Sequence, residues 1–193
     1  MILIIDNYDS FVYNLARYVK LAGMEICVVR NDQISVEECL AKKPNGVIIS
    51  PGPKAPKDAG ISLDLLNELS KQTPLLGVCL GHQCLVEYFG GVTKRSMRPL
   101  HGEASQIDHD GKDLFASLDA PLMAGRYHSL ISILEGEAKK ELSVQAFSEE
   151  GEIMAVKHKT YPWFGVQFHP ESILTPQGRN MIDNFVAICR ALI

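Results

Sequence analysis

A cysteine flanked by glycines is the strongest chemical signal in the chain. Cys79 follows the apolar run 75–78 and stands two residues from Gly77 and two residues from Gly81. This is the spacing of a nucleophile elbow, in which a strand turns sharply into a helix and bulky neighbours would collide. At a helix start, unpaired N–H groups and the helix dipole favour thiolate over thiol, and the N–H of Leu80 can stabilise an oxyanion. Cys79 is therefore the candidate nucleophile.

A histidine and a glutamate supply a candidate base and a group to orient it. His169 and Glu171 flank Pro170 at the end of the apolar segment 164–168. Residues two apart in an extended chain project to the same side, so these two side chains can lie close together. A carboxylate bonded to one imidazole nitrogen fixes the tautomer and leaves the other nitrogen free to take the proton of a thiol. Such pairs are common by chance, and only the coincidence with Cys79 predicts a Cys-His-Glu triad.

The tight loop after the apolar run 46–50 is a third candidate. Proline has no N–H, so the backbone donors on either side of Pro53 belong to Gly52 and Lys54. Gly52 also has no side chain to obstruct a close approach. The loop could therefore supply a second oxyanion donor, but taken alone these residues favour a plain turn.

Two other kinds of site fit the sequence less well. A zinc site could be formed by Cys79, His82, Cys84 and His169. The first three would lie on different faces of one helix, whereas structural zinc sites usually take their ligands in pairs from short turns. A dinucleotide site needs a glycine-rich loop after the first strand, where the segment 6–10 has none. The sequence predicts no metal site and no nicotinamide or flavin cofactor.

These candidates follow the ends of strands in an alternating pattern. The first half of the chain alternates apolar, strand-like runs with segments of helical periodicity. The expected strands are 1–5, 26–29, 46–50 and 75–78, and the expected helices are 12–22, 36–41 and 61–69. Apolar strands joined by helices indicate an α/β fold with an open, mostly parallel sheet and helices on both faces, and ligands bind beyond the carboxyl ends of such strands.

The sequence after residue 92 no longer alternates regularly between strand-like and helical patterns. The expected strands there are 142–147, 153–156 and 164–168, followed by a closing helix at 177–193. They indicate a smaller mixed or antiparallel extension of the sheet. With 193 residues and no linker, the whole chain, 1–193, is expected to form a single domain.

Composition excludes several classes of protein. The chain has 19 Lys and Arg against 23 Asp and Glu, a net charge of -4, so no nucleic-acid partner is expected. No apolar run reaches the roughly 18 residues of a membrane span, and no basic segment precedes the apolar start, so neither a membrane nor a secretory signal is expected. The five cysteines include no C-x-x-C pair, which indicates a reducing compartment, by default the cytoplasm.

Together, these motifs resemble those of the triad, or class I, glutamine amidotransferases. The segments that carry the resemblance are 77–83 (GVCLGHQ), 168–172 (FHPES) and 50–53 (SPGP). The segments 5–11, 58–61, 101–105, 126–130 and 168–178 are similar to the glutaminase subunits of anthranilate synthase and of para-aminobenzoate (aminodeoxychorismate) synthase. The resemblance therefore covers nearly the whole chain in order.

The resemblance implies a role for each candidate residue. Cys79 is implied as the nucleophile, His169 as the acid and base, and Glu171 as the group that orients the histidine. Backbone donors at Gly52 and Leu80 are implied to form the oxyanion hole. The residues implied to bind glutamine are Gly52, Pro53, Lys54, Leu80, Gln83, Ser129 and Leu130.

Two positions depart from the pattern of the family. Lys54 stands where the relatives usually have glycine, so it must adopt the dihedral angles of the loop without the freedom of glycine. Glu103 stands where they usually have lysine, which reverses the charge of any partner contact made there.

The activity that the resemblance implies is hydrolysis of the side-chain amide of L-glutamine through a γ-glutamyl thioester. The ammonia would pass to a chorismate-binding component I subunit of a synthase, most simply anthranilate synthase in tryptophan biosynthesis. The alternatives are para-aminobenzoate synthesis for folate, a subunit that serves both pathways, a catalytically idle regulatory or scaffold subunit, and a stand-alone cysteine hydrolase. No cofactor is expected in this chain, and any magnesium would belong to the partner.

Overall fold

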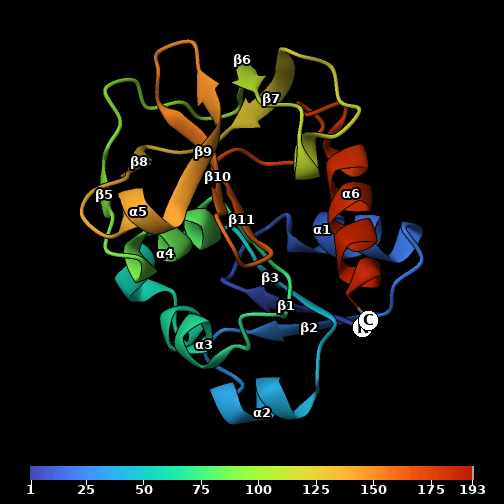
Figure 1. Ribbon diagram of the computed structural model, residues 1–193. Coiled ribbons are helices and arrows are strands. Elements are labelled where there is room, and N and C mark those ends of the chain that lie inside the picture. Colours follow the sequence, from blue (N-terminus) through green and yellow to red (C-terminus); the bar gives the residue numbers. More distant parts are fainter. Residues whose placement is uncertain (193) are drawn as a thin grey trace.

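A nine-stranded sheet runs through the molecule (Figure 1). In the computed structural model, which describes residues 1–192, the strand order is β2-β1-β3-β4-β11-β10-β9-β6-β7. The strands are β1 (Ile2–Asp6), β2 (Ile26–Arg30), β3 (Gly46–Ile49), β4 (Leu75–Val78), β6 (Glu103–His109), β7 (Leu122–Arg126), β9 (Leu142–Ser148), β10 (Ile153–His158) and β11 (Trp163–Val166). The strands from β2 to β11 in this order are parallel, and β10, β9, β6 and β7 continue the sheet in antiparallel fashion. Two further strands, β5 (Val92–Arg95) and β8 (Leu130–Ile133), form a separate antiparallel ribbon.

Helices cover both faces of the parallel part. The helices are α1 (Val12–Leu21), α2 (Val36–Ala41), α3 (Ser62–Glu68), α4 (Leu80–Tyr88), α5 (Ala138–Glu141) and α6 (Gly178–Ala191), with short 3-10 turns η1 (Pro56–Asp58) and η2 (Asp113–Phe115). Successive residues of β1 point to opposite faces, as a strand requires. Ile2 and Ile4 join the apolar core under α1 and α6, whereas Leu3 and Ile5 join the core under α3 and α4. The mostly parallel sheet with helices on both faces is confirmed, as is its antiparallel extension.

The predicted boundaries hold closely in the first half and less well in the second. The closing helix expected at 177–193 is α6, and Ile193 lies outside the described residues. The strands β5, β6, β7 and β8 were not predicted individually. β5 and β6 have mostly exposed or half-buried residues and so lack the continuous apolar run that identifies a buried strand.

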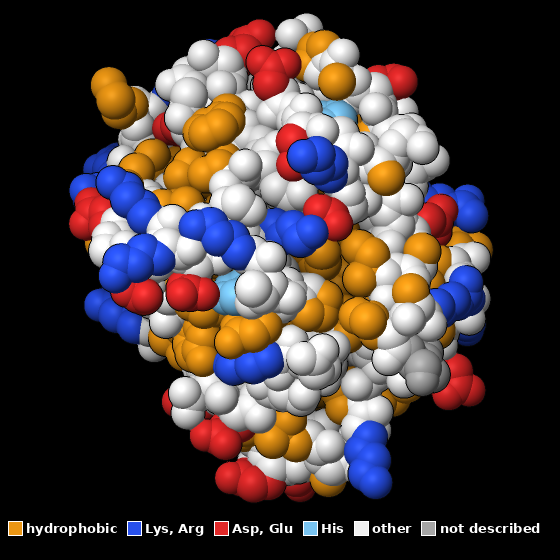
Figure 2. Space-filling model, in the orientation of Figure 1, with side chains coloured by type: hydrophobic (Ala, Val, Ile, Leu, Met, Phe, Trp, Pro, Cys, Tyr) orange, Lys and Arg blue, Asp and Glu red, His pale blue; other side chains and the backbone are white. Residues whose placement is uncertain are grey.

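The surface mixes charges of both signs. On the face seen in Figure 2, Lys and Arg side chains are interspersed with Asp and Glu side chains and with apolar patches. Within residues 1–192, no helix combines the length and the apolar character needed to cross a membrane.

Asn7 joins the loops that follow β1, β2 and β3. Its backbone N–H donates to Ser50 Oγ at 2.9 Å, and its side-chain amide donates to the Ser50 carbonyl at 2.9 Å. Its Oδ1 accepts hydrogen bonds from the Asn31 amide at 2.9 Å and from the Ser62 hydroxyl at 3.3 Å. All four side chains are buried, and buried polar groups that satisfy one another hold their segments in one arrangement. The loop that begins at Ser50 is thereby fixed at the carboxyl edge of the sheet.

Gly77 and Gly81 allow α4 to approach the sheet backbone to backbone. A Cβ atom on Gly77 would lie 2.4 Å from the carbonyl group of Gly81, and one on Gly81 would lie 2.2 Å from the carbonyl oxygen of Ile49. Real Cβ atoms essentially never come within 3.0 Å of such atoms. The sequence-based expectation that both positions need glycine is therefore confirmed, and β3, β4 and α4 meet at this point.

Replacing Gly81 by alanine tests this contact. Alanine is the better helix former by about 1 kcal/mol, so local propensity alone would stabilise α4. The clash with Ile49 should outweigh that gain, and we expect the free energy of unfolding in urea to fall by about 3 kcal/mol. The control is Gly136→Ala, at a φ of +49° with no atom within 4 Å of an added Cβ, where only the left-handed backbone costs about 1 kcal/mol. Unchanged or increased stability in Gly81→Ala would show that the contact does not restrict this position.

Candidate active site

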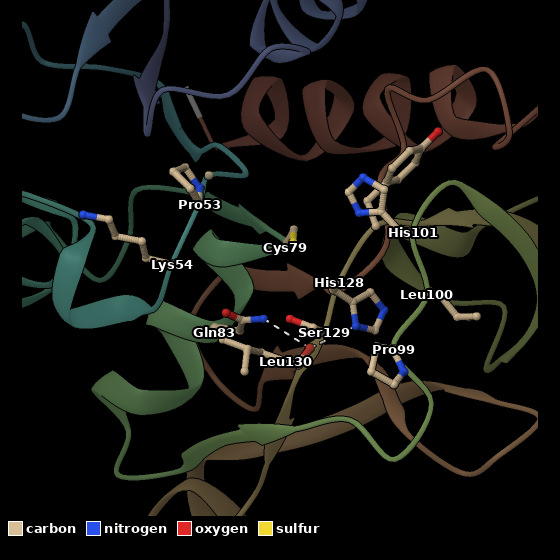
Figure 3. A pocket seen from close by; sticks show the side chains of 12 residues that line it. Pro53, Lys54, Cys79, Gln83, Pro99, Leu100, His101, His128, Ser129 and Leu130 are labelled. Carbon is tan, nitrogen blue, oxygen red and sulfur yellow. Dashed lines mark hydrogen bonds between the residues drawn. The ribbon is translucent and has the colours of Figure 1, made fainter.

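A cavity of about 320 Å³ lies at the carboxyl edge of the parallel strands (Figure 3). Its lining residues are Gly52, Pro53, Lys54, Cys79, Gln83, Pro99, Leu100, His101, Tyr127, His128, Ser129 and Leu130. The candidate nucleophile and all but one of the residues predicted to bind glutamine line it. The exception is Leu80, whose predicted contribution is its backbone N–H.

Cys79 occupies a strained position between β4 and α4. Its backbone has a φ of +50° and a ψ of -99°, a conformation that costs a non-glycine residue about 1–3 kcal/mol. The residue is only 7% exposed, and its sulfur points into the cavity between Pro53 and His101 (Figure 3). The predicted elbow is therefore present.

Two backbone donors remain free beside this sulfur. The N–H groups of Leu80 and Gly52 donate to no backbone carbonyl within residues 1–192. Their segments touch, because a Cβ on Gly52 would lie 2.9 Å from Leu80 Cδ2. Free N–H groups next to a nucleophile are the donors that an oxyanion requires.

His169 and Glu171 form a buried pair. His169 Nδ1 lies 2.6 Å from Glu171 Oε1, and the residues are 4% and 2% exposed. A carboxylate only accepts, so Nδ1 carries the proton and Nε2 is left without a hydrogen-bond partner within residues 1–192. Burial alone would lower the pKa of His169, but the Cys79 thiolate and the Glu171 carboxylate together raise it well above its ordinary value. Nε2 is thus free to exchange a proton, and Cys79 is close enough to act on the pKa of the ring.

The geometry that brings this pair together differs from the expected one. Pro170 and Glu171 lie in a turn, in which the Ser172 N–H donates to the His169 carbonyl at 3.2 Å. The expectation of an extended segment was wrong, although the expected proximity is confirmed. Gly178 at the start of α6 lies against this turn, so closely that a Cβ there would be 1.7 Å from the Pro170 carbonyl oxygen. The turn therefore lies between α6, which it touches at Gly178, and β7, where the His169 N–H donates to the Gly125 carbonyl at 3.0 Å.

The other cysteines lack the properties of a nucleophile. Burial raises the pKa of the Cys84 and Cys189 thiols to about 12, and it also raises the pKa of Cys39. Cys27 is half-buried and does not line the cavity. In the part of the chain that the structure describes, no three His, Cys, Asp or Glu side chains converge on a position for a metal ion.

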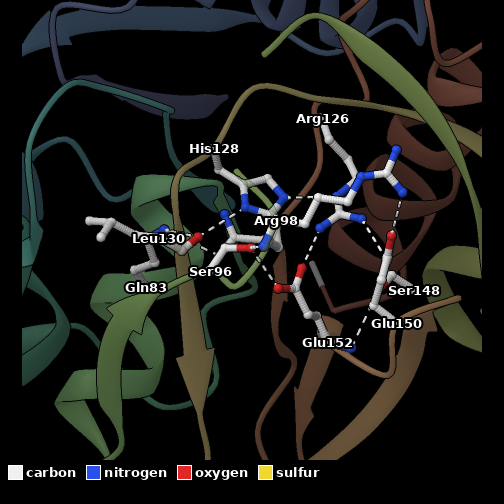
Figure 4. Close-up of polar contacts among 10 residues, drawn as sticks. Gln83, Ser96, Arg98, Arg126, His128, Leu130, Ser148, Glu150 and Glu152 are labelled. Carbon is white, nitrogen blue, oxygen red and sulfur yellow. Dashed lines mark hydrogen bonds and ion pairs between the residues drawn. The ribbon is translucent and has the colours of Figure 1, made fainter. Parts of the chain in front are cut away.

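An ion-pair network centred on Arg126 supports two residues of the cavity wall, His128 and Leu130, and Figure 4 shows its contacts. The fully buried Arg126 pairs with Glu150 at 3.1 Å and with Glu152. Its Nε donates to His128 Nε2 at 3.1 Å, and because a guanidinium can only donate, the proton of His128 must reside on Nδ1. Nδ1 then donates to the Leu130 carbonyl at 2.9 Å. Burial, followed by the charge of Arg126, lowers the pKa of His128 to about 3, so this ring is neutral.

Five lining residues were missed as site residues: Pro99, Leu100, His101, Tyr127 and His128. Two of the motifs named above include some of them, but no chemistry could be assigned from their spacing. Asp9, in the loop after β1, is a further group near the triad. Its burial, and next the charge of Glu171, raise its pKa to about 6.

The structure shows the backbone conformation or the contact at each of the two positions that depart from the family pattern. Lys54 has a φ of +70°, which confirms that a side chain occupies a backbone conformation suited to glycine. Its amine points away from Cys79 in Figure 3. Glu103 lies at the start of β6 and forms an exposed ion pair with Arg98 at 3.9 Å.

Comparison with known proteins agrees with this geometry. Residues 3–189 match the family Glutamine amidotransferase class-I. The chain is 48% identical over 190 residues to the aminodeoxychorismate/anthranilate synthase component 2 of Bacillus subtilis, covering 98% of this chain and 97% of that protein. It is also 48% identical over 189 residues to the bifunctional protein TrpGD of Thermotoga maritima, covering 97% of this chain but only 32% of that relative.

A solved structure shares the fold. The crystal structure of a Thermoplasma acidophilum protein described as a GMP synthase subunit superposes with a TM-score of 0.87 at 24% identity, covering 98% of this chain and 94% of that one. The nucleophile elbow, the buried His-Glu pair and the match along nearly the whole sequence lead to one conclusion: this chain belongs to the class I glutamine amidotransferase family.

Proposed function

We propose that this protein is the glutaminase subunit of a chorismate-aminating synthase. The observation that carries the proposal is the Cys79 sulfur, which faces a cavity of about 320 Å³ bounded by free backbone donors and fixed polar groups. Anthranilate synthase, and hence tryptophan biosynthesis, is the first assignment. The name of the Bacillus subtilis relative includes both aminodeoxychorismate and anthranilate synthase. The second assignment is therefore a role in para-aminobenzoate and folate synthesis, or in both pathways.

The proposed reaction uses the geometry described above. The Cys79 sulfur attacks the side-chain amide carbon of glutamine, and His169 takes the thiol proton. The N–H groups of Leu80 and Gly52 stabilise the negative charge that develops on the amide oxygen. His169 then gives its proton to the departing ammonia, leaving a γ-glutamyl thioester on Cys79. Water, deprotonated by His169, hydrolyses this thioester to glutamate and restores the thiol.

The proposed acceptor site lies on another subunit. Support comes from the relative of which this chain spans 97%, because that protein is called component 2 of its synthase. Ammonia must reach chorismate unprotonated, which favours a closed passage between subunits over release into water. The proposed steps in this chain use only its own side chains and backbone, and any magnesium would serve the chorismate-binding component I. Five free thiols suit a reducing compartment such as the cytoplasm.

Replacing Cys79 by alanine should abolish glutamate release from glutamine, to below about one thousandth of the wild-type rate, because no other thiol faces the cavity. In the complex with component I, synthesis from ammonium salts should stay near the wild-type rate. Cys84→Ala is the control and should leave both rates unchanged. Retained glutaminase activity in Cys79→Ala would contradict the assignment of the nucleophile. A wild-type complex that releases no glutamate would instead indicate an idle regulatory subunit.

Glu171→Gln should slow thioester formation about 10²-fold less than His169→Ala, because an amide oxygen can still accept from Nδ1 whereas nothing replaces the proton carrier. Single-turnover quenching of the acyl-enzyme measures this step directly. Glu149→Gln, in the exposed turn between β9 and β10, is the control and should have no effect. Equal rates in the Glu171 and His169 variants would argue against separate roles.

The isolated chain should hydrolyse glutamine slowly, and component I should raise kcat about 10²-fold. The physical reason is that an oxyanion donor displaced by a fraction of an ångström loses most of its effect. The Asn7 contacts anchor only the start of the loop at Ser50, so docking of a partner can still shift the Gly52 N–H by such a fraction. Glutamate release is measured for the isolated chain and for the complex, each with and without chorismate. An isolated chain that already runs at the rate of the complex would favour a stand-alone hydrolase.

A further inference from the structure

A buried amide lies beside the nucleophile and has no role in the reaction described so far. Gln167 follows β11 and is completely buried. Its Nε2 lies 3.6 Å from Cys79 Sγ, within the reach of an N–H···S hydrogen bond. Its backbone N–H donates to the Met154 carbonyl at 2.8 Å, so the neighbouring strand β10 holds the residue in place.

The orientation of this amide follows from its neighbours. Gln83 Nε2 lies 3.4 Å from the Leu130 carbonyl, which can only accept, so the NH2 group of Gln83 must face it. The same Nε2 donates to Gln167 Oε1 at 3.2 Å. The oxygen of Gln167 is thereby assigned to the Gln83 side, and its NH2 group is left facing the sulfur of Cys79.

We propose that Gln167 is a catalytic residue of the glutaminase, whose amide N–H holds the sulfur of Cys79 as a thiolate directed at the substrate. The inference rests on the proposed role of Cys79 as nucleophile. A hydrogen bond to a charged acceptor is stronger than one to a neutral acceptor, so a fixed donor favours the thiolate over the thiol. His169 accepts the proton on one side of the sulfur, and Gln167 stabilises the charge on another.

Substitution of Gln167 leaves the other titratable side chains around Cys79 chemically unchanged. These are His169 with Glu171 and Asp9 close to it, His82 and Cys84 on α4, and Lys54, His101, Tyr127 and His128 on the cavity wall. A change in the titration of Cys79 on substitution of Gln167 therefore reports the loss of the amide contact.

The test is the pH dependence of alkylation of Cys79 by iodoacetamide in the full chain, followed by mass spectrometry of the peptide that contains Cys79. The inflection of this profile belongs to the Cys79 and His169 pair together. In Gln167→Leu it should move upward by about one pH unit, because the donor to the thiolate is lost. In Gln167→Glu it should move further, because a carboxylate replaces the donor beside the sulfur. Gln167→Met, with similar length and no donor, replaces the leucine variant if that variant does not fold.

Gln145→Leu is the matched control. Gln145 is also buried and donates to Asp110 and Asp113, so its loss costs stability without touching Cys79, and the inflection should not move. A folded Gln167→Leu or Gln167→Met variant with the wild-type inflection would overturn the inference. The alkylation profile is measured without glutamine. An upward shift of its inflection therefore supports the Gln167 contact even if the wild-type complex releases no glutamate. That failure would count against the proposed function alone.

Discussion

The backbone of Cys79 is the constraint on which the rest of the site depends. A φ of +50° at a non-glycine residue persists only where the surroundings enforce it. Here β3, β4 and α4 enforce it by meeting backbone to backbone at Gly77 and Gly81. This packing directs the sulfur into the cavity and leaves the Leu80 N–H without a backbone acceptor in the described chain. A relaxed backbone would lose both features at once.

The candidate active site lies where the two halves of the sheet meet. The parallel half supplies Cys79 and, through Asn7, a fixed loop at Ser50. The antiparallel half supplies Arg126, whose buried charge is neutralised by two glutamates and whose Nε determines the tautomer of His128. Since an unpaired charge at this depth would cost several kcal/mol, the network has few alternative arrangements. Neither half alone contains both Cys79 and the complete lining of the cavity.

The parts of this site that could be predicted from sequence are those defined by local spacing. Gly77 and Gly81 each lie two positions from Cys79, and His169 lies two positions from Glu171, so both patterns are visible in the sequence. Gln167 and Cys79 are 88 residues apart, and Asn7 and Ser50 are 43 apart. Such contacts depend on strand order, which hydrophobic periodicity does not specify. The same limit explains the error at Glu171, whose turn contacts both α6 at Gly178 and β7 at Gly125, segments that are distant from it or unpaired in the sequence pattern.

A chain of hydrogen bonds leads from Arg126 to Cys79, and the bonds in it differ in length. The contact of His128 with the Leu130 carbonyl is 2.9 Å, whereas Gln83 lies 3.4 Å from the same oxygen and Gln167 lies 3.6 Å from the sulfur. Catalytic hydrogen bonds are commonly long before a substrate binds and shorten in the complex. The contacts at the ion-pair end are already short, so we expect any shortening at the contacts beside the cavity. In the proposed mechanism, glutamine bound in the cavity would therefore act on Cys79 through Gln83 and Gln167, which are linked to each other and to the Leu130 carbonyl.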